Sequence, residues 1–132
     1  MIRHVWSVLC RQAFVEPTTN EVALNVLEAF SLPTPPPEAT VIGGTFHLMS
    51  LWHCDLGSNG FGYLVKATGP SGTALANLEV PVAEFLAPSV GARSRATFRG
   101  IPFDGLGIYW FRVMRLVDGQ EILDAEVPLH MA

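Results

Sequence analysis

Short apolar runs follow one another along the whole chain, separated by clusters of glycine, proline, asparagine and aspartate. Runs of this length with turn residues between them are typical of antiparallel β-strands. Asp118-Gly119 joins the last two runs, and the segment 56–60 (LGSNG) joins two others, as hairpin turns do. The pattern predicts about eight strands, near the number in a β-sandwich. They cover the segments 4–16, 21–32, 41–54, 61–68, 73–85, 95–101, 106–117 and 121–130.

The segment 21–32 carries two competing signals. Thr18 and Glu21 fit a helical capping box, and good helix formers follow them. The apolar residues between Val22 and Phe30 also recur at the period of two that marks a strand. We favour a strand, because a strand-like run and a short turn precede the segment; a helix is the alternative.

Prolines mark loops and strand edges. The segment 33–38 (PTPPPE) fits neither a helix nor a central strand, and 87–94 is expected to be a loop. Pro81 and Pro128 fall inside predicted strands, where a missing amide hydrogen is tolerated at an edge or a bulge. We therefore expect 121–130 to be an edge strand on which a partner strand could pair, or one whose proline only prevents aggregation.

Composition narrows the class of protein. The 132 residues fit one domain, 1–132, and a hydrophobic content of 49% excludes intrinsic disorder. A net charge of −4 argues against nucleic-acid binding. No apolar run reaches the ~20 residues that cross a bilayer, and the run between His4 and Arg11 is too short for a secretory signal. We expect a cytoplasmic protein without a membrane or nucleic-acid partner.

The chain has two cysteines, Cys10 and Cys54, both inside apolar runs. In a reducing cytoplasm, two buried thiols are the simpler interpretation. A single disulfide between the two residues is the alternative.

The segment 98–112 (FRGIPFDGLGIYWFR) resembles a feature of immunoglobulin-like domains. Gly107, Tyr109 and Phe111 form a G-x-Y-x-F motif at the start of a strand. A tyrosine at this position in those domains forms a "tyrosine corner", in which its hydroxyl bonds the backbone just upstream. The Cys–Trp–Cys framework of true immunoglobulin domains is absent.

The chain also resembles a family of uncharacterised bacterial β-sandwich proteins, a domain of unknown function. The matching features are an apolar strand with a cysteine (5–10), a second run through Ala29–Phe30, a proline-rich loop (34–37) and the motif G-x-Y-x-F followed by Asp-Gly. This resemblance supports an all-β fold, an antiparallel β-sandwich of about seven to eight strands that is immunoglobulin-like in general architecture. It implies no activity and no functional residues.

Three arginines form a candidate ligand-binding stripe. On a strand, Arg93, Arg95 and Arg99 share one face, while Ala96 and Phe98 point to the core. Such a stripe could bind a phosphate, a carboxylate or an acidic partner through bidentate contacts. The alternative is a solvated face that pairs with acidic residues on the next strand.

His53 and Asp55 are candidate metal ligands. They share a strand face two residues apart, so a carboxylate could orient an imidazole there. A metal site would need a third ligand from another strand, such as His4 or His130. The alternative is a polar strand end, and we expect no metal and no cofactor.

The tryptophans suggest two further uses. Trp6, Trp52 and Trp110 could form a stacking platform for a sugar, or they could pack in the core. The segment 106–117 is apolar on both faces, and Trp110, Met114 and Leu116 share one of them. A strand with two apolar faces is either central or covered by a partner, which makes this face a candidate interface.

The chain has no phosphate-binding loop, dinucleotide fingerprint, serine nucleophile elbow or paired C-x-x-C motif. The main hypothesis is therefore a non-enzymatic interaction or structural module that binds a protein partner or self-associates. A small-ligand or carbohydrate-binding module is the first alternative. A metal-dependent enzyme around His53 and Asp55 is the second.

Overall fold

A computed structural model describes residues 2–19, 21–54, 61–82 and 91–132. The described residues form strands, turns and loops without a helix, so the predicted all-β class is confirmed. None of them forms a helix with the length and apolar character needed to cross a membrane. The strands are β1 (Ile2–Val15), β2 (Val22–Val26), β3 (Ala29–Phe30), β4 (Val41–Cys54), β5 (Phe61–Thr68), β6 (Ala74–Val82), β7 (Ala92–Pro102), β8 (Gly107–Val117) and β9 (Gln120–Met131).

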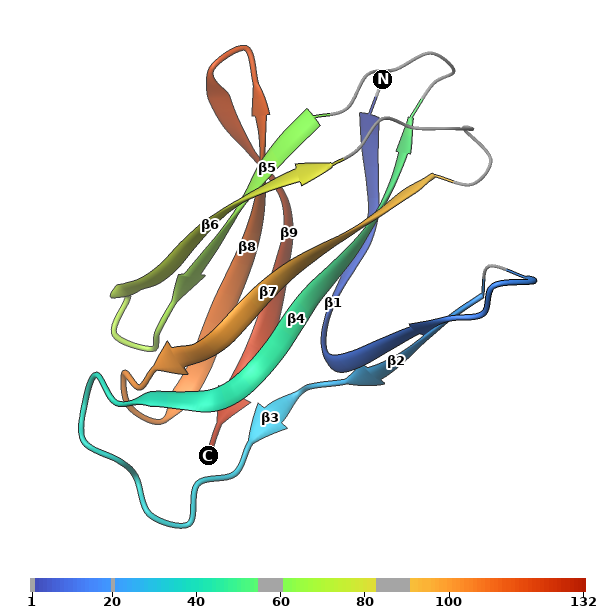
Figure 1. Cartoon of the computed structure of the whole chain (residues 1–132). Coiled ribbons are helices and arrows are strands. Elements are labelled where there is room, and N and C mark those ends of the chain that lie inside the picture. Colours follow the sequence, from blue (N-terminus) through green and yellow to red (C-terminus); the bar gives the residue numbers. More distant parts are fainter. Residues whose placement is uncertain (1, 20, 55–60, 83–90) are drawn as a thin grey trace.

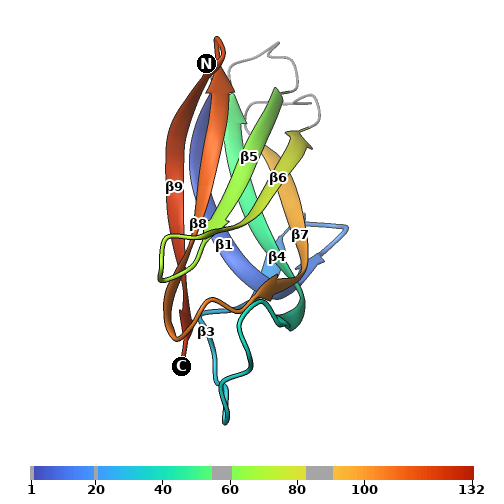
Figure 2. The same ribbon diagram turned by 90° about the vertical axis from the view of Figure 1, so that its left-hand side faces the viewer.

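The strands form two sheets that face each other as layers (Figures 1 and 2). Sheet A has the order β2-β1-β4-β7, and sheet B has the order β3-β9-β8-β5-β6. The paired strands are antiparallel except β3 and β9, which form a short parallel pair through Ala29–Phe30. The sequence pattern predicted antiparallel pairing throughout, and the exception arises because β3 belongs to the passage of the chain from sheet A to sheet B.

Alternate residues of the central strands fill the space between the sheets. Phe46 of β4 and Phe111 of β8 meet edge to face, with ring centroids 5.9 Å apart. Trp52 of β4 and Tyr63 of β5 lie 5.0 Å apart, and all four side chains are fully buried. The apolar alternation along each strand therefore joins both sheets through one core.

The segment 21–32 contains strands, so the helix alternative is wrong. The residues expected to cap a helix build a turn instead: the Glu16 carboxylate accepts hydrogen bonds from the backbone N–H and the hydroxyl of Thr19. The Glu16 N–H then donates to the Glu21 carbonyl at 2.8 Å. This turn returns the chain antiparallel to β1, so β2 pairs with it.

The predicted edge position is confirmed for Pro81 and holds only in part for Pro128, because β9 is the second strand of sheet B. Pro81 lies on β6, the terminal strand of sheet B. Pro128 lies on β9, where most of the strand has only β8 as a neighbour because β3 contacts just its C-terminal end. One loop boundary was wrong: β7 begins at Ala92 instead of after residue 94. The expected hairpin turn 56–60 and the segment 83–90 fall outside the described residues.

Cys10 is a free, buried thiol, as expected. Within sheet A, β1 pairs Cys10 with His47 and Ile2 with Cys54, so the two cysteines belong to opposite ends of β1. At ~3.3 Å per residue, their Cα atoms are far beyond the ~7 Å that a disulfide can span. The disulfide alternative is therefore wrong.

A hairpin formed by the second half of β1 and by β2 leaves the body of the molecule (Figure 1). We call residues 11–26 the arm. At its base, the Arg11 guanidinium donates to the carbonyl oxygens of Gly43 and Thr45 and lies 5.0 Å from the centroid of the Phe30 ring. These contacts fix the point at which β1 separates from β4.

The hydroxyl of the tyrosine in the G-x-Y-x-F motif bonds the backbone upstream of its strand. The Tyr109 hydroxyl donates to the Gly105 carbonyl at 2.7 Å and accepts from the Asp104 N–H at 2.6 Å. The Asp104 carboxylate in turn accepts from the N–H and the hydroxyl of Ser71. Tyr109 therefore fixes the loop that enters β8 and connects it to the β5–β6 turn.

Candidate functional site

The outer face of sheet A carries the arginine stripe. Arg95 and Arg99 are exposed on β7, while Ala96 and Phe98 beside them are buried, as the alternation predicted. Arg93 is half-buried on the same face. The strand thus presents its guanidinium groups to solvent on one side and packs its apolar side chains into the core on the other.

The residues directly opposite the arginine stripe on the described part of β4 are not acidic. On β4, the residues opposite Arg93, Arg95 and Arg99 are Leu51, Met49 and Thr45. β7 is the terminal strand of sheet A, so the described strands provide no second neighbour. The β4 residues opposite Arg95 and Arg99 therefore provide no carboxylate to neutralise these two guanidinium groups, whereas Arg93 takes part in an interaction of its own.

An apolar strip borders the arginines on β4 and β1. Trp6 pairs with Leu51 and Val8 with Met49, and Met49 is only 4% exposed although it lies on the outer face. Trp6 shares this face with Val8 by the regular alternation of β1, and the register shift between His4 and Trp6 turns His4 to the inner face instead. We call Trp6, Val8, His47, Met49, Leu51, Arg93, Arg95 and Arg99 the basic face.

The charge of the basic face comes from its arginines. Burial lowers the pKa of His47, and the nearby Arg95 lowers it further, so this imidazole is neutral at neutral pH. Its Nδ1 lies 3.0 Å from the Thr97 hydroxyl. Burial also raises the pKa of the Cys10 thiol, and Arg95 offsets part of that effect. Because arginine stays protonated, the face keeps its positive charge over the physiological pH range.

Sheet B presents a different outer face. The candidate interface residues lie there on β8, opposite the buried side of that strand: Trp110, Met114 and Leu116. Lys66 and Arg112 share this face, and each pairs with a carboxylate of β9, at 2.7 Å and 3.2 Å. This face therefore combines apolar groups with neutralised charges.

The three tryptophans do not form one platform. Trp6 lies on the outer face of sheet A and Trp110 on the outer face of sheet B. Trp52 is fully buried between the sheets. A stacking platform made of all three is therefore wrong, because they belong to three separate layers.

The histidines proposed as metal ligands point in different directions. His53 lies on the outer face of β4, whereas His4 points inward and contacts Trp52 edge to face at 5.0 Å. Asp55 lies outside the described residues. Within the described ranges, no three His, Cys, Asp or Glu side chains lie close enough together to hold a metal ion.

A chain of polar side chains crosses the core between the sheets. The Trp52 indole N–H donates to the Ser94 hydroxyl at 3.1 Å, and that hydroxyl lies 2.7 Å from the Tyr63 hydroxyl. Tyr63 also bonds Ser50, whose oxygen lies 2.6 Å from that of Ser7. Burial raises the pKa of Tyr63, and its bonds to the two serines offset part of this rise.

The chain of polar groups ends at His4, whose Nε2 lies 2.7 Å from the Ser7 hydroxyl. The imidazole also forms a hydrogen bond with the Trp6 backbone, and because this bond raises the pKa of His4, the ring is the donor. The indole N–H of Trp52 can only donate and a backbone carbonyl can only accept, so the hydroxyls between them donate in one direction, towards His4. In the described residues, every buried side-chain nitrogen and oxygen has a hydrogen-bond partner.

Acidification is expected to destabilise the protein through His4. Burial holds the pKa of His4 below its usual value, and Arg115 adds to this effect, while Asp124 and the bond to Trp6 oppose it. The folded protein therefore favours the neutral imidazole more than the unfolded chain does. The resulting contribution to the free energy of unfolding is complete above the usual pKa of histidine, and it is lost as the pH falls through the lowered pKa of the folded state. A protonated Nε2 could no longer accept from Ser7. Urea unfolding at several pH values from about 7.5 to about 5 measures the loss.

The His4→Gln variant tests this assignment, because the amide oxygen can accept from Ser7 but does not titrate. Its free energy of unfolding should depend less on pH than that of the wild type. His47→Gln is the comparison on the outer face. An equal pH dependence in the wild type and in His4→Gln would exclude His4 as the responsible group.

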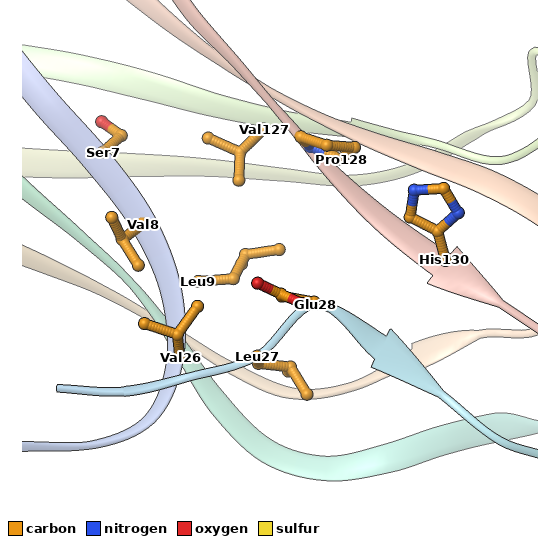
Figure 3. A pocket seen from close by; sticks show the side chains of 9 residues that line it. All are labelled: Ser7, Val8, Leu9, Val26, Leu27, Glu28, Val127, Pro128 and His130. Atoms are coloured by element: carbon orange, nitrogen blue, oxygen red, sulfur yellow. The ribbon is translucent and has the colours of Figure 1, made fainter.

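A pocket of about 350 Å³ opens between the two sheets where β1 faces β9 (Figure 3). It lies on the side of the molecule where the first half of β1 pairs only with β4 and most of β9 pairs only with β8, and residues 26–28 line one end. The lining is mostly apolar: Ser7, Val8, Leu9, Val26, Leu27, Glu28, Val127, Pro128 and His130. We call it the seam pocket. Ser7 connects it to the polar chain in the core.

Sequence reasoning missed Trp6 and Val8 as members of the basic face, and it missed the polar chain and the seam pocket. Comparison with models of known protein families gives no match. Comparison with well-characterised protein sequences gives none either. Function is therefore inferred from the geometry of these surfaces.

Proposed function

We propose that the protein is a non-enzymatic interaction module, built as a β-sandwich of general immunoglobulin-like architecture, whose basic face binds an acidic, extended segment of a protein partner. One observation carries the proposal: on β4 the residues opposite Arg95 and Arg99 are Met49 and Thr45, neither of which is acidic, and the stripe borders an apolar strip that includes Trp6 and Leu51. Exposed guanidinium groups beside apolar side chains suit a ligand that is both acidic and apolar.

The position of the stripe favours an extended peptide. β7 is the terminal strand of sheet A, and such a strand can pair with an added strand through its free backbone groups. Alternate residues on a strand are ~7 Å apart, both in β7 and in a peptide paired with it. Carboxylates at every second position of the peptide would therefore match Arg93, Arg95 and Arg99 in register.

A peptide fits the charge distribution better than a nucleic acid does. The chain has a net charge of −4, and the cations of sheet B are paired with carboxylates. A phosphate backbone would meet one positive strip on an otherwise acidic molecule, whereas nucleic-acid binding normally needs a broader basic surface. The single stripe matches the width of one added strand.

The double variant Arg95→Gln/Arg99→Gln is expected to bind an acidic peptide at least about tenfold more weakly than the wild type, because it loses two charge-assisted contacts. The probe is a fluorescently labelled peptide with alternating glutamate and valine, measured by anisotropy at low and high salt. The matched control is Asn77→Glu/Gln120→Glu, which lowers the net charge by the same amount at exposed positions of sheet B.

Equal weakening in both double variants would refute a specific site, because it would reflect net charge alone. If labelled single-stranded DNA bound as tightly as the peptide, the proposed ligand would be a nucleic acid and not a peptide. We expect the arginine variant to lose peptide binding, the control variant to retain it, and the wild type to bind DNA only weakly.

The seam pocket supports a second candidate function, the binding of a small apolar ligand. Its volume of about 350 Å³ is within the range of small-molecule sites, and most of its lining is apolar. Native mass spectrometry of the purified protein distinguishes the two functions. A small molecule retained in the pocket would add a discrete mass to the purified protein to which no ligand has been added. A module that binds only peptides would show the mass of the chain alone.

A further inference from the structure

The arm is apolar and exposed, although the rest of β1 packs into the molecule. Phe14, Val15 and Val26 are 56%, 50% and 59% exposed. Phe14 pairs with Ala23, and Val15 with Val22, so both sides of the hairpin carry apolar groups. A projecting hairpin with this much apolar surface normally packs against something.

The end of the arm also carries two carboxylates beside a hollow. The hollow has a volume of about 280 Å³ and is lined by Phe14, Val15, Glu16, Glu21, Val22 and Ala23. Hydrogen bonds from Thr19 hold the pKa of Glu16 below its usual value, so this carboxylate is ionised at neutral pH. The Glu21 side chain is exposed. Apolar walls with two carboxylates suit an arginine side chain: its methylene stem packs on the walls and its guanidinium meets the charges.

The geometry points to a second copy of this chain as the partner: we propose that the arm of one copy docks on the basic face of another, with Arg95 in the hollow at the arm's end. This inference rests on the proposed function, since it names the partner of the same face. The surfaces are complementary in both properties. The arm is acidic and apolar, whereas the basic face is positive and apolar.

The contact must be intermolecular. The arm points away from β4 and β7, which carry most of the basic face (Figure 1). Because each copy has one arm and one basic face, two copies related by a two-fold axis can exchange arms and form the contact twice. Such a dimer leaves neither surface exposed.

Two charge reversals test the docking. The arm-reversed variant is Glu16→Arg/Glu21→Arg, and the face-reversed variant is Arg95→Glu/Arg99→Glu. Sedimentation velocity should find a dimer for the wild type, weakened by salt, and a monomer for each variant alone, since each brings like charges together. An equimolar mixture of the two variants should dimerise, because both contacts of the mixed pair are complementary.

A separate variant is needed to show that loss of the dimer does not reflect misfolding, because the Glu16 carboxylate also accepts hydrogen bonds from Thr19. Glu16→Gln/Glu21→Gln keeps oxygen acceptors at both positions and removes only the charges. This variant should fold like the wild type and dimerise more weakly. Circular dichroism of every variant shows whether a monomer is folded.

A wild type that is monomeric at high concentration would overturn the inference, and so would a mixture of folded variants that stays monomeric. The proposed function is tested independently by the acidic peptide. If the protein is monomeric but binds the peptide through Arg95 and Arg99, the proposed function is supported and the docking of a second copy is refuted. A dimer that both reversals leave intact would assign self-association to another surface, such as the one with Trp110.

Discussion

Replacing Tyr109 with alanine is expected to lower the free energy of unfolding by about 3–5 kcal/mol, the usual range for a large buried aromatic side chain. The side chain is fully buried on β8, so its loss leaves a cavity between the sheets. Its hydroxyl also bonds the backbone of Asp104 and Gly105, which positions the loop before β8. Urea unfolding followed by tryptophan fluorescence measures the change.

Tyr109→Phe separates the ring from the hydroxyl. It keeps the packing but leaves the Asp104 N–H and the Gly105 carbonyl without this partner, which should cost about 1–3 kcal/mol. The alanine variant must therefore be the less stable of the two. A loss below about 1 kcal/mol in Tyr109→Ala would mean that the ring is not part of the core.

The alternation of apolar residues predicted the strands and their inward faces well. Phe111 and Val113 point to the core and Trp110 points away, because the strand period of two leaves no other choice once one face is buried. Pro81 could be assigned to an edge for the same kind of local reason, the missing amide hydrogen, and Pro128 lies on a part of β9 that pairs only with β8. These predictions depend only on neighbouring residues.

The membership of the basic face could not be predicted in full, because it depends on which strands pair. The arginines of β7 were recognised from their spacing, but the identity of the residues opposite them on β4, which include no carboxylate, follows from the order of sheet A. Trp6 alternates regularly with Val8 on β1, but its place beside Leu51, and so near the arginines, follows only from the pairing of β1 with β4 and of β4 with β7.

The polar chain was missed for a related reason. Ser7, Ser50 and Ser94 are far apart in the sequence, and a single serine in an apolar run gives no sign of its partner. Serines in strands are usually taken as surface residues, yet Ser50 is fully buried here. Only the packing of the two sheets brings these hydroxyls to Tyr63 and the Trp52 indole.

Replacing Ser94 with alanine is the second change expected to have a large effect. Its hydroxyl is the partner of both the Trp52 indole N–H and the Tyr63 hydroxyl, and all three side chains are buried. Alanine removes only one oxygen but leaves two buried polar groups without this partner. At about 1–3 kcal/mol for each such group, we expect the free energy of unfolding to fall by roughly 2–5 kcal/mol.

Two further variants distinguish lost hydrogen bonds from lost packing. Ser31→Ala, at an exposed loop position, should change the stability by less than about 0.5 kcal/mol. Tyr63→Phe/Ser94→Ala removes both hydroxyls, so the tyrosine no longer lacks a partner. The double variant should therefore lose less stability than the two single variants predict by addition.

The sign of this coupling decides whether the serines and Tyr63 act as one chain. If the hydroxyls donate in sequence towards His4, the Ser94→Ala substitution already removes part of the stability that the Tyr63 hydroxyl contributes. Adding Tyr63→Phe then lowers the free energy of unfolding by less than it does in the wild type. Strictly additive effects would mean that Ser94 and Tyr63 contribute separately, with water taking the vacated position. The pH dependence assigned to His4 would then remain, but it would act through Ser7 alone and not across the core.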